Sequence, residues 1–149
     1  MQLEKEINTV RFESRYQQAI VNVLYTFNWC NDKLKELIVP YEITTQQFNV
    51  LRILRGQFPV PSTINLLKSR MLDKMCDASR IVDRLVQKDL VEKEPNRSDK
   101  RSVSILISKK GLALLAKMDE EISISNIISS NLTEAEAIQL NSLLDKMRG

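Results

Sequence analysis

Four polar residues in the middle of the chain have side chains and a spacing that suit binding to a nucleic acid. Ser79, Arg80, Asp83 and Arg84 recur three or four positions apart, so they would share one face of a helix. Arginine can donate two hydrogen bonds to O6 and N7 of guanine, and the hydroxyl of Ser79 can reach a base edge or a phosphate. These residues therefore predict a helix face that reads a duplex.

A second basic run follows at residues 95–101, where Arg97, Lys100 and Arg101 are offset by Asp99. Its proline, asparagine and serines are turn-forming residues, so the run predicts a narrow cationic loop. Such a loop suits a minor groove, whose negative potential attracts arginine. A solvated helix face and an exposed turn are the alternative explanation of each run taken separately.

The net charge of +3 is distributed unevenly over the chain. Residues 68–111 hold twelve basic and seven acidic side chains, a net charge of +5, whereas residues 1–38 are neutral, residues 39–67 carry +1 and residues 112–149 carry −3. Basic side chains that neutralise phosphates release condensed counterions, so the middle stretch suits a polyanion. A solvated lysine-rich surface would explain the charge equally well by itself.

The composition gives little support to catalysis or metal binding. The chain has no histidine, which is the commonest general base and metal ligand, and two cysteines cannot close a four-ligand zinc site. We therefore expect no enzymatic activity, no cofactor and no metal. Cys30 and Cys76 lie 46 positions apart and no run of 18 apolar residues occurs, so we expect a soluble protein of the reducing cytoplasm.

The length of 149 residues, with only 3 glycines and 4 prolines, predicts one mainly helical domain, residues 1–149. Apolar residues such as Ile7, Val10 and Ile20 predict a long first helix at about residues 5–37. Further helices are expected at about residues 44–56, 63–71, 75–88, 109–128 and 133–147. The expected N-caps are Thr44, Ser62 or Thr63, Ser108 and Thr133, and the expected C-terminal glycine of the second helix is Gly56.

Two short β-branched segments, residues 90–94 and 102–107, flank the basic turn and predict a hairpin. Two short helices followed by a hairpin with a basic tip form a winged helix-turn-helix, in which the second helix enters the major groove. The expected fold class is therefore mainly α with a small β-hairpin wing. Helices at both ends of the chain would lie outside the winged region of about residues 44–107.

Three segments carry a more specific pattern: residues 79–93, residues 96–103 with Asp99-Lys100-Arg101, and residues 107–112 with Ser108-Lys109-Lys110-Gly111. This pattern resembles the multiple antibiotic resistance regulator (MarR) family of winged helix-turn-helix transcriptional regulators. The resemblance extends over almost the whole length, through residues 44–51, residues 132–136 and the long opening helix.

The resemblance implies roles for individual residues. Asp99 would orient Arg101, which enters the minor groove, while Ser79 and Arg80 would face the major groove or its phosphates. Ser62 or Thr63 would offer a helix N-terminus to a phosphate. The complete set of expected DNA-binding residues is Ser62, Thr63, Lys74, Ser79, Arg80, Asp83, Arg84, Arg97, Asp99, Lys100 and Arg101.

The chain departs from the family pattern at two positions. The family usually has glycine at the position of Asp89 and often near Leu72, which puts the geometry of these turns in question, although aspartate tolerates a left-handed backbone better than most residues. Asp77 is an unusual residue so near DNA. We interpret it as a candidate N-cap of the recognition helix.

The terminal helices have apolar stripes that a small winged domain cannot cover. Residues 1–38 and 112–149 are therefore the expected dimerisation region, and the family resemblance implies the same homodimer. A two-fold dimer would place its recognition helices ~34 Å apart and require a roughly palindromic operator. A monomeric helical bundle is the alternative.

Regulation by a ligand is implied by the resemblance, because family members commonly lose DNA affinity when a small aromatic or lipophilic anion binds between the dimerisation helices and the winged domain. Tyr25, Trp29, Phe48 and Met71 are the candidate lining residues, and ordinary core positions are the alternative. Some relatives sense oxidants through a cysteine near the first helix, so Cys30 is either such a sensor or a structural thiol. Zinc-sensing relatives use histidines, which this chain lacks.

The sequence thus predicts a homodimeric, sequence-specific transcriptional regulator, a repressor released by a small ligand. A protein-interaction or anti-regulator module on the same fold is the main alternative. A small helical enzyme is a more distant one, since no nucleophile and base pair, carboxylate dyad or phosphate-binding glycine loop is recognisable.

Overall fold

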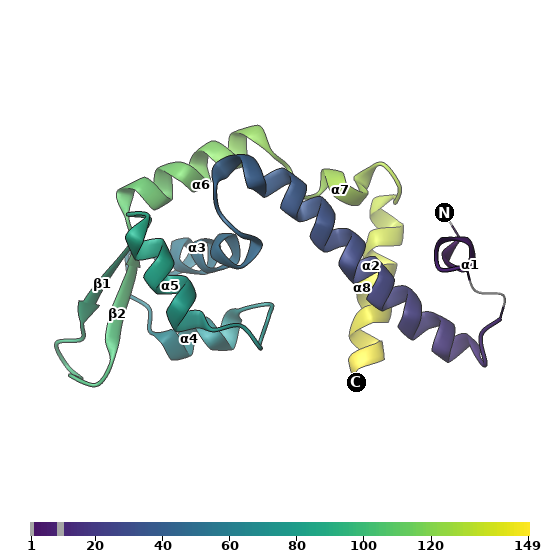
Figure 1. Ribbon diagram of the computed structural model, residues 1–149, viewed down its shortest axis with the longest axis horizontal. Helices are drawn as coiled ribbons and strands as arrows, with labels where there is room; N and C mark the ends of the chain where they lie inside the picture. Colours follow the sequence, from purple (N-terminus) through teal and green to yellow (C-terminus); the bar gives the residue numbers. More distant parts are fainter. Residues whose placement is uncertain (1, 9–10) are drawn as a thin grey trace.

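The computed structural model describes residues 2–8 and 11–149 and has the expected fold class, mainly helical with one antiparallel hairpin (Figure 1). Its elements in chain order are α1 (Leu3–Glu6), α2 (Arg15–Ile38), the 3-10 helix η1 (Val39–Tyr41), α3 (Thr45–Gln57), α4 (Ile64–Arg70), α5 (Ala78–Gln87), β1 (Val91–Pro95), β2 (Val103–Ile107), α6 (Lys109–Glu121), α7 (Asn126–Ser129) and α8 (Glu134–Arg148). Within these residues, no helix combines the length and apolarity needed to cross a membrane.

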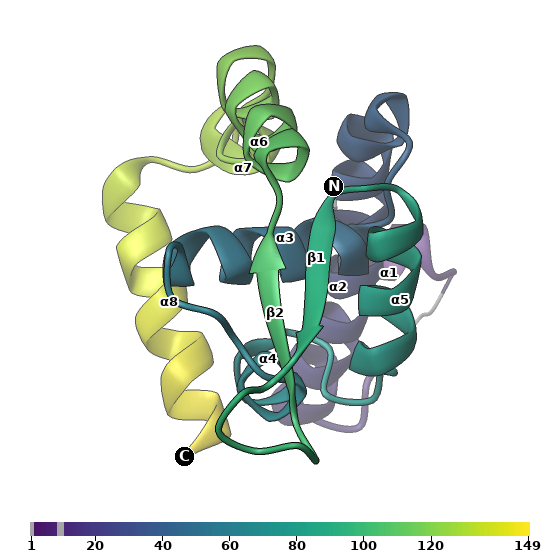
Figure 2. The same cartoon turned by 90° about the vertical axis from the view of Figure 1, so that its left-hand side faces the viewer.

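The elements form two groups that the long helices α2 and α6 connect. In Figure 1, α3, α4, α5 and the hairpin lie together at one end, and α1, α7 and α8 lie with most of α2 at the other. Figure 2 looks at the first group, with the hairpin in front of α3 and α5 beside β1. The turn of the hairpin, α4 and the N-terminal end of α5 lie at the same end of this group in both views.

The first helix differs from its prediction, because the expected helix over residues 5–37 is two helices. The chain leaves α1 after Glu6 and adopts a left-handed backbone at Asn8, with φ of 52°. The α2 helix starts only at Arg15, where the hydroxyl of Ser14 accepts a hydrogen bond from the N–H of Gln17 at 3.1 Å. Val10, which the prediction placed in the apolar stripe, lies outside the described residues.

Most predicted helix starts are confirmed by their capping hydrogen bonds. The hydroxyls of Thr44 and Thr133 cap α3 and α8 in capping boxes, and Ser108 caps α6. Of the two alternatives before α4, the cap is Thr63.

Two predicted helix ends are wrong. Gly56 does not end α3, which continues to Gln57 with Phe58 as its C-cap. The helix after Ser108 ends at Glu121 rather than near Ile128, because Ile122 adopts an extended backbone and α7 starts separately at Asn126. Isoleucine and serine, which alternate from Ile122 to Ser125, are weaker helix formers than the residues of α6, and this explains the break.

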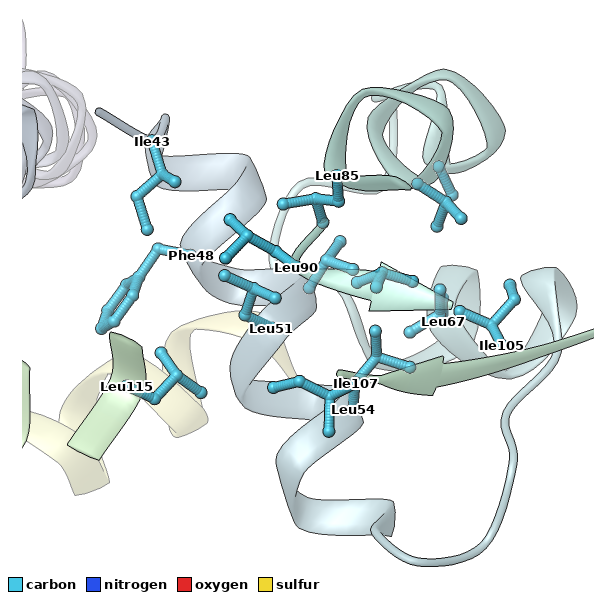
Figure 3. Packing of buried hydrophobic residues seen from close by; sticks show 14 of the residues in the cluster. Ile43, Phe48, Leu51, Leu54, Leu67, Leu85, Leu90, Ile105, Ile107 and Leu115 are labelled. Atoms are coloured by element: carbon cyan, nitrogen blue, oxygen red, sulfur yellow. The ribbon is translucent and has the colours of Figure 1, made fainter. Parts of the chain in front are cut away.

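The hydrophobic core lies beneath the hairpin. Figure 3 shows its side chains converging between α3, α5, the strands and α6, among them Leu51, Leu85, Ile105, Ile107 and Leu115. By contrast, α2 has Ile38 as its buried residue and α8 has none. The winged region is thus packed around its own core, whereas α8 has only half-buried and exposed residues among those described.

The hairpin pairs β1 with β2 in a register that sets Val91 opposite Ile107 and Lys93 opposite Ile105. Ser62 adds an isolated bridge to β2, with both backbone hydrogen bonds to Ile105 at 2.8 Å. The turn between α5 and β1 has Asp89 in the left-handed region, with φ of 60°. This confirms that aspartate occupies the left-handed conformation at a position where the family usually has glycine.

Candidate nucleic-acid interface

The α5 helix presents a polar face because its apolar residues are turned to the core. Ala78, Val82 and Leu85 are buried, while the side chains of Ser79 and Arg80 are exposed. The carboxylate of Asp77 accepts a hydrogen bond from the N–H of Arg80 at 3.1 Å, so Asp77 is the N-cap of α5 as interpreted from the sequence. Arg84 is also exposed, so the serine and both arginines are free to meet a ligand.

The turn of the hairpin is held by hydrogen bonds between its own residues. Asp99 Oδ1 accepts from the backbone N–H of Arg101 at 2.9 Å, and Asn96 Oδ1 accepts from the backbone N–H of Ser98 at 2.9 Å. The N–H of Ser102 donates to the carbonyl of Asp99 at 3.0 Å. Asp99 therefore contacts the backbone of Arg101 here, and this contact orders the turn and leaves the guanidinium exposed.

Arg97, Lys100 and Arg101 are exposed on this turn. The turn lies at the same end of the molecule as α4 and the N-terminal end of α5 (Figures 1 and 2). The fold therefore brings the two basic runs of the sequence to one end of the winged region. A negatively charged partner at this end would therefore be attracted by both basic runs together.

Two predicted contact residues have other partners in the structure. The ammonium of Lys74 donates to the carbonyls of Lys68 and Ser69, at 3.3 and 2.6 Å, so it caps the C-terminal end of α4. The carboxylate of Asp83 forms an ion pair with Lys93 of β1 at 2.7 Å. Both residues are exposed, yet their charged atoms are already engaged within the chain.

Ser62 is misplaced in the set of predicted DNA contacts. Its side chain is buried, with 1% of the residue exposed, because its backbone pairs with Ile105 in the sheet. Its hydroxyl has no hydrogen-bond partner among the residues that the structure describes. Thr63 is half-buried, and its hydroxyl accepts from the N–H of Leu66 at 3.2 Å. Within this pair, Thr63 is thus the residue whose side chain caps the start of α4.

The sequence analysis placed the four candidate ligand residues in one cleft, but in the structure they line two separate hollows. Phe48 and Met71, both buried, line a groove of about 1240 Å³ between α2, α3 and the loop that follows α4. Tyr25 and Trp29 line a separate hollow of about 170 Å³ beneath α1, where the hydroxyl of Tyr25 donates to Glu6 at 3.2 Å. The prediction failed because Tyr25 and Trp29 lie about 200° around α2 from Phe27 and Asn31, which line the groove.

The cysteines are both free thiols in half-buried positions. Burial raises the pKa of the Cys30 thiol, and burial followed by the charge of Asp73 raises the pKa of the Cys76 thiol. The Cys76 thiol also donates to the carbonyl of Asp73 at 2.9 Å. Over residues 2–8 and 11–149, no three His, Cys, Asp or Glu side chains are grouped to hold a metal ion.

Known proteins have sequences similar to that of this chain. A model of the MarR family matches residues 43–103, from before α3 to the start of β2. The multiple antibiotic resistance protein MarR of Escherichia coli K12 is 30% identical over 128 residues, which cover 84% of this chain and 88% of that protein. The chain belongs to the MarR family.

Solved structures with the same fold match this chain over most of its length. A mutant MarR from E. coli complexed with operator DNA has a TM-score of 0.74 and 28% identity, covering 99% of this chain and 99% of that chain. BpsR of Bordetella bronchiseptica, whose structure concerns regulation of its DNA binding by 6-hydroxynicotinic acid, has a TM-score of 0.71 and 21% identity, covering 89% of this chain and 99% of its own. The second likeness concerns the fold alone.

Sequence reasoning missed Lys93 as the partner of Asp83. Its signal was present, since alternation along a strand places residue 93 on the same side as the apolar Val91. A charged residue on that side must reach out of the core, and Lys93 does so toward Asp83. The hydrogen bonds of Asn96 and Ser102 within the turn were also missed, and only the general preference of such residues for turns pointed to them.

Proposed function

We propose that this MarR-family chain is a homodimeric transcription regulator that represses by binding a roughly palindromic operator in double-stranded DNA. The observation that carries the proposal is the joint exposure of the α5 arginines and the basic hairpin turn at one end of the winged region. A recognition helix in the major groove with a wing in the adjacent minor groove requires this placement. The operator complex of a MarR protein with the same fold supports it.

Within this proposal, each exposed residue has a role set by its chemistry. Ser79, Arg80 and Arg84 reach base edges or phosphates in the major groove. Arg97, Lys100 and Arg101 serve the minor groove and its flanking phosphates, with Asp99 ordering the turn that carries them. The half-buried Thr63 caps the start of α4, where a phosphate could meet the helix N-terminus. Lys74 and Asp83 act through the contacts they make within the chain, and Ser62 has a structural role.

The homodimer is supported by apolar side chains that the chain leaves exposed at its two ends. On α2 these include Ile20, Leu24 and Phe27, exposed by 52%, 58% and 60%. On α8 they include Ile138 and Leu143, exposed by 64% and 57%. A second copy would bury both sets, which monomeric proteins rarely leave in water. Residues 1–38 and 112–149 thus form the proposed dimerisation region beside a winged region of residues 44–107.

The regulating ligand of this proposal is a small aromatic or lipophilic anion held in the groove between α2 and α3. Phe48 and Met71 supply apolar walls. Arg52, another lining residue, has its guanidinium 5.6 Å from the centre of the Phe48 ring and is exposed to a carboxylate or phenolate. The groove also includes Leu72 to Lys74, the loop that leads to α5, so a bound molecule would displace the recognition helix.

The proposal is tested by measuring the oligomeric state and the salt dependence of duplex binding. Analytical ultracentrifugation should give twice the mass of the chain, and log affinity should fall with log salt by about 0.9 per phosphate contacted. A dimer that binds a partner protein without salt dependence and prefers no duplex would instead favour an interaction module. Candidate anions are then added to the complex, and release of the duplex identifies the ligand.

A further inference from the structure

Asp83 and Lys93 join the recognition helix to the wing. The ammonium of Lys93 lies 2.7 Å from Asp83 Oδ1, and the two side chains are 31% and 55% exposed. Lys93 lies on the same face of the hairpin as the buried Val91, and opposite the buried Ile105. Its aliphatic stem therefore follows the covered side of the hairpin, while its charge emerges at α5.

Asp83 belongs to the polar face of α5, four residues after Ser79 and three after Arg80. An unpaired carboxylate on this face would repel the phosphates that the arginines attract. The contact with Lys93 neutralises it. The same contact occupies the charge of Lys93, which is then not available to a phosphate.

Lys93 lies in the outer part of β1, so its contact with Asp83 affects the position of the wing relative to α5. The base of β1 is fixed by the buried Val91, whereas residues 92–95 are exposed. Arg97 and the basic turn follow directly. A change in the angle between the outer part of β1 and α5 therefore moves the wing tip relative to the recognition helix, and the ion pair resists that change.

We propose that Asp83 and Lys93 are a positioning pair, which holds the wing at the distance from α5 at which both reach their grooves together. Asp83 contacts no base in this account. The proposal rests on the operator binding proposed above. It assigns to Lys93 a contact within the chain, whereas a basic residue near the wing would be expected to contact a phosphate.

A double-mutant cycle on operator affinity tests the pair. Lys93→Met and Asp83→Asn should each weaken binding by up to about fivefold, the range of an exposed ion pair. The double variant should bind the operator no more weakly than the weaker-binding single variant does, and Lys93→Arg, which keeps the charge, should bind with wild-type affinity. Lys109→Met and Glu42→Gln, which remove exposed charges outside the basic end of the winged region and outside the proposed dimerisation region, are the matched controls and should bind as the wild type does.

Two other roles give different results. If Asp83 accepts a hydrogen bond from a base, Asp83→Asn alone relaxes the preference at one base pair, and Lys93→Met does not. If Lys93 contacts a phosphate, the charge-neutral double variant lowers the log–log salt slope by about 0.9. Either result, or additive losses in the cycle, overturns the proposal.

Hydrogen exchange of the DNA-free protein separates this proposal from the proposed function. Amides of residues 96–103 should exchange faster in both single variants, while those of α2 keep the wild-type rate. Unchanged exchange in a protein that binds its operator overturns the positioning pair alone. If the wild type binds no operator, the proposed function fails and the positioning pair is overturned with it.

Discussion

At position 111 the first turn of α6 passes so close to the turn after α5 that a side chain does not fit. A Cβ there would overlap the carbonyl oxygen of Leu90 and lie 2.7 Å from Cγ1 of Ile107. We expect Gly111→Ala to lower the free energy of unfolding by about 1–3 kcal/mol, measured by urea denaturation. Gly56→Ala is the matched control, because nothing lies within 4 Å of its Cβ, and it should raise that free energy by up to ~1 kcal/mol. Equal changes in the free energy of unfolding for the two variants would show that the close approach at position 111 does not exclude a side chain.

The arginines of the interface are the next test at the scale of single residues. Arg80→Ala should cost about 1–3 kcal/mol of operator binding free energy and relax the preference at one base pair, measured with duplexes mutated position by position. Arg101→Ala should weaken binding similarly and relax the preference at the flanking positions read by the wing. Lys109→Ala, which removes an exposed cation at the start of α6, should leave affinity unchanged. Loss of affinity that is uniform over all sequences would show that Arg80 contacts a phosphate rather than a base.

The site residues that the sequence could identify are those whose role depends on local pattern. Asp77 was recognisable as a cap because it precedes the apolar stripe of α5. Ser62 was not recognisable as buried, since its burial depends on a bridge to Ile105, 43 positions away. The partner of Asp83 was hidden for the same reason: tertiary pairing of α5 with β1 determines it.

At the scale of elements, the capping box of α8 makes the start of that helix sensitive to pH. Hydrogen bonds from the backbone N–H and the hydroxyl of Thr133 lower the pKa of Glu136 from its ordinary value. A lowered pKa in the folded state stabilises the helix above the ordinary glutamate pKa, and this contribution is lost as pH falls through the lowered pKa. We expect faster amide exchange in the first turn of α8 below that pH, and no such step in Glu136→Gln. A step that persists in the variant would assign it to another group.

Helix starts were predictable and some helix boundaries were not, for physical reasons visible in particular elements. The starts of three helices could be predicted from Thr44, Ser108 and Thr133, because each hydroxyl accepts a hydrogen bond from a backbone N–H group three residues further along the chain. The division between α1 and α2 was missed because the predicted apolar stripe joined Val10 to Ile20 across ten positions, although Ser14 in that interval is a typical N-cap residue and caps α2. Helical periodicity already places Tyr25 and Trp29 on the other side of α2 from the groove-lining Phe27, whereas the packing of α1 against them depends on tertiary structure and could not be predicted.

At the scale of the whole molecule, binding to a palindromic operator requires a second copy of the chain. Leu143→Glu places a charge on the exposed apolar face of α8, where the side chain is 57% exposed in the single chain. We expect the variant to fold and to sediment as a monomer, with operator affinity about tenfold lower or worse, because its two half-sites are no longer bound together. Val60→Glu, at an equally apolar residue that is 63% exposed in the α3–α4 connection, should stay dimeric. A dimeric Leu143→Glu protein would place the interface elsewhere.

The most direct test of the central claim is selection of bound duplexes from a random DNA pool at two salt concentrations. The account predicts an enriched, roughly palindromic sequence whose half-site centres lie about one helical turn, or a multiple of it, apart. Binding to it should weaken steeply at the higher salt concentration. A folded dimer that enriches no sequence, with and without candidate anions, would contradict the account and favour a protein partner for the same surface.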